Sequence, residues 1–176
     1  MKKLLYLFLT VSLIFSSCKK EDEVVTPTAI NGCTDSQATN YNANANADDS
    51  SCLYEIAGVW QWESPEAIGY SNIYSFFWPT GEYAMEYYDA TNTAVRVTIG
   101  TFSLSSNQQS CSITDLGYNL VNGTWVPDAL EVTTSFTITK FNGSELDVTN
   151  PVVSAELNKT SIPLPDAPSF LADISN

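Results

Sequence analysis

Short runs of alternating apolar and polar residues dominate the chain from Tyr54 onward, and the period of an amphipathic helix is absent there. Turn residues separate these runs, a pattern typical of an antiparallel sheet that closes or stacks. Pro79-Thr80-Gly81 and Asn142-Gly143 predict tight hairpins, and Asn122-Gly123 predicts a small extra hairpin made of residues 118–122 and 124–126. The main strands are expected at residues 56–63, 71–78, 82–89, 94–104, 112–118, 130–141, 145–149 and 152–159.

Alternation along each strand predicts which side chains point into the domain, because successive residues face opposite sides of a sheet. In the strand 94–104 the apolar positions change parity after Gly100. We expect a bulge or a sharp bend at this glycine, since small barrels use such bends to turn corners. Arg96 and Thr98 are expected on the outward face of that strand. The inward faces are expected to carry Tyr83, Met85, Tyr87, Val95, Val97, Ile99, Phe102, Leu104, Leu130, Val132, Phe136, Ile138, Val153, Ala155 and Leu157.

The first residues have the features of an export signal. Lys2 and Lys3 precede an apolar run over residues 4–15, which is shorter than the roughly 20 residues that a membrane-spanning helix needs. The sequence Ser16-Ser17-Cys18 ends a segment that resembles a lipobox, in which small residues precede a cysteine that receives lipid before cleavage. The resemblance implies a signal peptide at residues 1–17 and a lipid anchor on Cys18. The alternative is an ordinary signal peptide with an incidental cysteine.

Residues 18–31 are charged or rich in Pro and Thr, without periodicity, and predict a solvated tether to the membrane. Two lysines followed by the acidic residues 21–23 resemble the surface-export signal of lipoproteins in one group of Gram-negative bacteria. This resemblance implies an outer-membrane lipoprotein, on the cell surface or on the periplasmic face. At the other end, residues 161–176 carry several prolines and predict a tail that cannot continue the sheet.

The charge and the residue composition exclude several classes of function. The chain has 20 acidic and 7 basic residues, a formal net charge of −13, and cleavage after residue 17 would remove two of the basic ones. Such a charge disfavours nucleic acid as a partner, because phosphate binding relies on clusters of Lys and Arg. The chain has no histidine, which excludes histidine-dependent catalysis and histidine-ligated metals. We therefore expect a monomeric binding or structural protein rather than an enzyme.

Three cysteines follow Cys18. Cys33 and Cys52 bracket a polar segment without an apolar core, and in an oxidising compartment a disulfide between them is expected. Cys111 is left over at the start of a predicted strand. A buried free thiol is expected there, because a nucleophilic cysteine needs an activating base and no histidine exists to supply it.

Residues 32–53 form a small module of their own. Gly-Cys-Thr-Asp at its start, Ala-Thr-Asn-Tyr in the middle and Asp-Asp-Ser-Ser-Cys at its end resemble a module of secreted and surface proteins of marine bacteria, with Ser50 where that module usually has glycine. Oxygen-bearing side chains at alternate positions allow a calcium site, because Ca²⁺ takes 6–8 oxygen ligands. The alternative is a disulfide-closed knot whose Asn and Asp side chains form turns. The candidate calcium ligands are Asp35, Asn40, Asn42, Asn44, Asp48 and Asp49.

Residues 54–160 resemble lipocalin-like domains of bacterial lipoproteins. Gly58-Val59-Trp60 matches their Gly-x-Trp start, residues 76–83 match their aromatic hairpin, and residues 134–138, 145–149 and 155–157 match their closing meander. The resemblance implies an all-β fold, an antiparallel lipocalin-like β-barrel of about eight strands. Residues 105–128 depart from the family pattern, because they are long and irregular where the family has a compact strand.

A barrel of this kind implies an apolar interior that holds a small hydrophobic or amphipathic ligand. Trp60 is expected to plug the closed end. Arg96, the only arginine, is a candidate anchor for a ligand carboxylate or a partner of a surface Glu. Alternatively, aromatic side chains fill the barrel and the protein has a structural or partner-binding role, or, more remotely, they bind or process carbohydrate. The candidate ligand-binding residues are Trp62, Tyr74, Tyr83, Tyr87 and Arg96.

Overall fold

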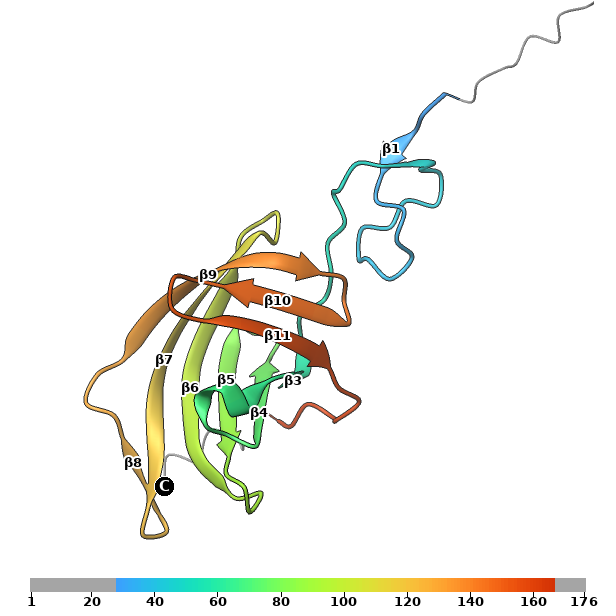
Figure 1. The fold of residues 1–176 in the computed structure, drawn as a ribbon. Coiled ribbons are helices and arrows are strands. Elements are labelled where there is room, and N and C mark those ends of the chain that lie inside the picture. Colours follow the sequence, from blue (N-terminus) through green and yellow to red (C-terminus); the bar gives the residue numbers. More distant parts are fainter. Residues whose placement is uncertain (1–27, 167–176) are drawn as a thin grey trace, which may run out of the picture.

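The protein is an all-β molecule built on a closed antiparallel barrel of eight strands (Figure 1). The computed structural model describes residues 28–166. The signal peptide, Cys18, most of the tether and the end of the tail lie outside these residues. The barrel strands are β3 (Gly58–Trp62), β4 (Asn72–Phe77), β5 (Glu82–Tyr88), β6 (Ala94–Leu104), β7 (Ser110–Val121), β9 (Val132–Phe141), β10 (Glu145–Thr149) and β11 (Ser154–Lys159).

Each barrel strand pairs with its neighbour along the chain, and β11 pairs with β3 to close the sheet. A short 3-10 helix, η1 (Pro65–Ile68), lies in the connection between β3 and β4. No helix within residues 28–166 is both long and apolar enough to cross a membrane. The continuous strand pairing, closed by β11 and β3, confirms the predicted barrel of about eight strands.

The segment expected to be irregular is more regular than predicted. β7 runs without interruption to Val121 and pairs with β6 from Leu104↔Cys111 to Arg96↔Asn119. Its first half also pairs with β9, whereas its second half pairs with the short β8 (Thr124–Pro127). The small hairpin predicted at Asn122-Gly123 is confirmed, and it extends β7 beyond the barrel wall (Figure 1).

The barrel has a core on each side of its wall. The inner core surrounds Trp60, Ile73 and Tyr83, which are at most 1% exposed. A smaller outer core lies on the opposite face of the same strands and contains Val59, Phe76, Trp78 and Ala84, with Leu164 of the C-terminal tail packed against it. The Trp78 indole donates a hydrogen bond to the Pro165 carbonyl oxygen at 2.8 Å. The tail thus leaves the sheet, as predicted, and covers the outside of the barrel.

The predicted orientation of β6 is wrong before Gly100, whereas Phe102 and Leu104 face the inner core as predicted. Thr98 and Arg96 pair with Met85 and Tyr87, whose side chains line the interior, and both point inward with them. Ile99 packs instead against the outer core. The apolar pattern changes parity at Gly100 for this reason. Before it the apolar residues of β6 lie on the outer face, and after it they lie on the inner face, where Phe102 packs against the inner core.

Gly100 does not mark a bulge in the pairing of β6 with β7, whose register is continuous there. A Cβ atom at this position would lie 1.9 Å from the Thr114 carbonyl oxygen and 2.7 Å from the Asp115 Cα atom. Glycine is needed because the backbone of β7 approaches β6 closely at this point. Leu130, which was predicted to point inward from a strand, precedes β9 and lies at the rim of the barrel, where it is 76% exposed.

The small module is closed by the predicted Cys33–Cys52 disulfide. Two short strands, β1 (Asn31–Gly32) and β2 (Ala47–Asp48), pair in parallel beside it. Tyr54 connects the module to the barrel: its hydroxyl donates to Asp35 at 2.8 Å, and its backbone exchanges hydrogen bonds with the Gln108 side chain. The module therefore lies at the end of the barrel that carries the β6–β7 turn (Figure 1).

Candidate ligand-binding cavity

A cavity of about 450 Å³ occupies one end of the barrel. This volume lies within the range of small-molecule sites in proteins. The surrounding segments are η1, the loop after β8 and the β10–β11 turn, which contribute Ile68, Leu130 and Val152 to the rim. In an up-and-down barrel these connections lie at the end opposite the β6–β7 turn. The cavity therefore opens away from the disulfide module.

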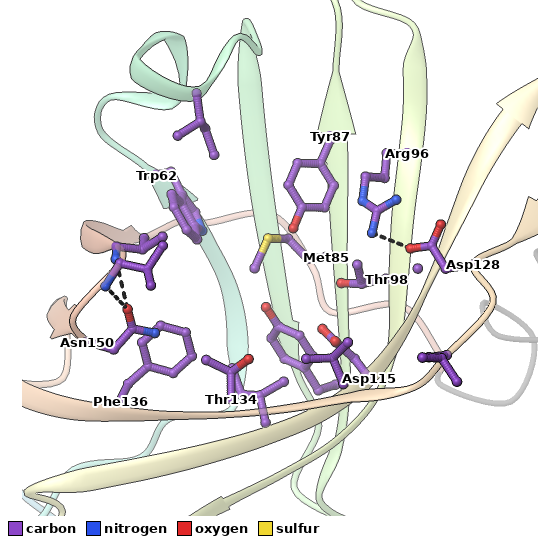
Figure 2. Close-up of a pocket in the computed structure, with 18 residues that line it drawn as sticks. Trp62, Met85, Tyr87, Arg96, Thr98, Asp115, Asp128, Thr134, Phe136 and Asn150 are labelled. Carbon is purple, nitrogen blue, oxygen red and sulfur yellow. Dashed lines mark hydrogen bonds and ion pairs between the residues drawn. The ribbon is translucent and has the colours of Figure 1, made fainter.

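The inner part of the cavity is apolar. Met85, Ile113 and Phe136 line it from three different strands. Figure 2 shows Met85 and Phe136, with Trp62 at one side. A smaller void of about 40 Å³ continues below them and is lined almost entirely by apolar side chains, including Cys111. Successive side chains of a strand face opposite sides of the sheet, so every second residue of each strand points into the barrel, and these residues occupy such positions.

The far end of the barrel is closed by Trp60, as predicted. This side chain has no exposed surface, and its indole donates a hydrogen bond to the Ile56 carbonyl oxygen at 2.8 Å. Phe141 packs against its edge, and the Lys159 ammonium lies 5.4 Å from its ring centroid. The indole N–H has a hydrogen-bond partner and the ring is closely packed, so Trp60 blocks this end of the barrel. A ligand would therefore enter from the opposite end.

One wall of the cavity is polar. The Arg96 guanidinium donates to Asp128 Oδ2 at 2.7 Å and to Asn119 Oδ1 at 2.9 Å, and the Asn119 amide donates to Asp128 Oδ1 at 2.8 Å. Gly117 lies beneath this cluster, and a Cβ atom there would come within 2.2 Å of both Arg96 and Asp128. The absence of a side chain at position 117 makes room for the Arg96–Asp128 ion pair, which Figure 2 shows.

Asp115, Thr98 and Tyr87 lie beside this ion pair (Figure 2). Burial raises the pKa of the Asp115 carboxyl above its usual 3.8, against the lowering influence of Thr98 and Arg96. Burial likewise raises the pKa of Tyr87 to about 12. The Thr98 hydroxyl is buried and has no hydrogen-bond partner of good geometry, although it lies close enough to Asp115 and Tyr87 to lower both pKa values.

Four of the five predicted ligand-binding residues line this cavity: Trp62, Tyr83, Tyr87 and Arg96. The exception is Tyr74, which lies on the outer face of β4 and packs against the outer core. The prediction for Tyr74 is wrong because β4 carries apolar residues on both faces. Its sequence pattern therefore does not show which face points into the barrel. The partner of Arg96 is Asp128 rather than a surface Glu.

Sequence reasoning missed the acidic members of the site. Asp115 and Asp128 both line the cavity, yet they lie in the segment expected to be irregular. Alternation from Ile113 places Asp115 on the inner face of the strand that was expected at residues 112–118, so this signal was available in the sequence. Asp128 follows β8 and reaches the cavity only through the tertiary fold.

Within the described residues, five of the six candidate calcium ligands of the module, all except Asn44, use their side chains in hydrogen bonds that hold the module together. Asn42, Asp48 and Asp49 each accept a bond from the backbone N–H two residues further on. Asn40 bonds to the backbone of Ser51 and Leu53. Across residues 28–166, no group of three or more acidic, Cys or His side chains is arranged to hold a metal ion. Calcium binding by the module stays a prediction.

Comparison of the chain with family models, with curated proteins and with solved structures found no match. The barrel itself is established by its strand pairing. The likeness to lipocalin-like domains is carried by the sequence motifs alone.

Proposed function

We propose that this protein is a lipid-anchored, lipocalin-like carrier that binds a small amphipathic molecule at the cell envelope. The observation that carries the proposal is the division of the cavity into an apolar interior around Met85 and Phe136 and a polar wall around Arg96. Such a site matches a ligand with an apolar body and one polar group, because a few placed polar groups orient a ligand that apolar contacts hold.

The layout of the chain supports the same role. A lipid on Cys18 and the following tether would precede the disulfide module, which lies at the closed end of the barrel. The cavity opens at the other end, away from the anchored side. In a carrier anchored in this way, the opening of the cavity faces away from the lipid anchor and toward the solvent.

A second role is favoured by the apolar rim of the cavity. Leu130 and Val152 are 76% and 89% exposed, and Ile68 and Val132 are also largely exposed. Exposed apolar residues grouped around one opening are typical of a surface that meets another molecule. The alternative function is therefore that of a surface lipoprotein that docks a partner at this rim.

Binding of a neutral apolar fluorophore, N-phenyl-1-naphthylamine, tests the carrier role. Thr134 points into the cavity, so Thr134→Trp should obstruct it and weaken binding at least tenfold. Ser135→Trp adds the same ring on the outer face of β9 and is the matched control. We expect the wild type and Ser135→Trp to bind alike. Equal binding by all three proteins, or none by the wild type, would contradict the carrier role.

A further inference from the structure

The charged side chains that line the cavity are predominantly negative. Within the part of the chain that the structure describes, they are Arg96, Asp115 and Asp128. Arg96 already donates to Asp128 and Asn119, and Asn119 holds the other oxygen of Asp128. A ligand carboxylate would have to displace this cluster and would meet a second carboxylate at Asp115. The polar wall of the cavity therefore disfavours the binding of an anionic ligand.

Two acceptors remain beside the ion pair. Asp115 forms no ion pair within residues 28–166, and the adjacent Thr98, a residue that is 4% exposed, has a buried hydroxyl without a hydrogen-bond partner of good geometry. A buried hydroxyl that lacks a partner carries a free-energy cost, which a ligand donor would remove. Both groups line the cavity, so a donor that enters from the mouth reaches them together.

We propose that the ligand is an amphipathic amine whose ammonium group binds at Asp115 and Thr98, with its apolar body against Met85, Ile113 and Phe136. This inference rests on the carrier role proposed above. An ammonium has three donors and no acceptor, which matches a carboxylate beside a hydroxyl.

The electrostatics favour the same polarity. Burial is the main cause of the raised pKa of Asp115; Arg96 lowers this pKa, whereas Glu131 and Asp128 raise it. A bound cation would lower that pKa again. Charge-assisted hydrogen bonds contribute roughly 1.5–3 kcal/mol, which corresponds to about tenfold or more in affinity.

The test compares three ligands with the same chain length and different head groups: decylamine, decanol and decanoate, titrated by calorimetry at pH 7 and physiological salt. We expect decylamine to bind at least tenfold more tightly than decanol, and decanoate to bind most weakly. In Asp115→Asn, decylamine should lose this advantage whereas decanol affinity stays within about twofold. Asp147→Asn removes one charge from the outer face of β10 and should change nothing.

An acidic protein also attracts cations to its surface, and the variant Thr134→Trp separates this effect from binding in the cavity. Decylamine binding that survives this substitution would be surface adsorption and would overturn the inference. So would equal affinities for the three ligands, or tighter binding of decanoate. Binding of decanol without any preference for the amine overturns only the inference, whereas failure of all three ligands to bind also overturns the carrier role.

Discussion

Arg96 and Asp128 form an ion pair at 2.7 Å that ties the loop after β8 to the inner wall of the barrel. The two residues are 32 positions apart in sequence. Asn119 bridges them from β7, so that three segments meet at one point on the cavity wall. The cluster thereby fixes the position of the loop that carries Leu130 at the rim.

Removal of either partner of this pair should loosen the loop after β8. Arg96→Met and Asp128→Asn should each lower the urea midpoint slightly, because both side chains are partly hydrated. Their effects should not add, since each substitution removes the same bond. The Arg96 hydrogen bond lowers the pKa of Asp128, so its stabilisation is present above pH 3.8 and is lost as the pH falls below that value. Additive effects in the double variant would show that the pair is not energetically coupled.

Gly100→Ala tests the close approach of β6 and β7. The new Cβ atom would overlap the Thr114 carbonyl oxygen, and this backbone atom moves only if the barrel wall deforms. We expect a loss of about 3 kcal/mol in the free energy of unfolding, as for an overpacked core position. Thr101→Ala, at an exposed position of the same strand, is the control and should change stability little. Similar stability of the two variants would mean that the strands separate more easily than the structure indicates.

Ser50 occupies a position in the module where the related sequence pattern has glycine. Its φ is +61°, in the left-handed region that glycine adopts without strain. We expect Ser50→Gly to stabilise the module by about 1 kcal/mol, measured as slower hydrogen exchange over residues 34–52. Ser51→Gly lacks this conformational benefit and should leave exchange unchanged or faster. Faster exchange in Ser50→Gly would indicate that the serine side chain stabilises the turn.

Asp115→Asn should stabilise the empty protein at neutral pH. Burial raises the pKa of Asp115 in the folded state, so the carboxyl begins to disfavour folding as the pH rises past 3.8, and its full effect is reached above the raised value. The advantage of the variant should therefore shrink as the pH falls through the raised value and disappear below 3.8, where the wild-type carboxyl is protonated in both states. Thermal unfolding of both proteins across this pH range measures the difference. A variant that is less stable at pH 7 would show that the carboxylate supports the fold.

The strands and their hairpins were predictable because alternation and turn residues are local signals. The faces of β4 and β6 were not. Tyr74 and Ile99 are apolar residues on the outer surface, and the tail around Leu164 covers that surface from far along the chain. A local pattern cannot distinguish an outer core from an inner one. The same limit applies to Asp128, whose place beside Arg96 depends on how β7 and β8 fold back over the barrel.

The central claim is that the barrel carries a small amphipathic molecule in the cavity lined by Met85, Phe136 and Asp115. Native mass spectrometry of the full chain, purified from its own cells in parallel with Thr134→Trp and Ser135→Trp, tests it most directly. We predict an added mass of one small molecule on the wild type and on Ser135→Trp, and its loss from Thr134→Trp. Unliganded masses for all three proteins, or an adduct that survives Thr134→Trp, would contradict the claim.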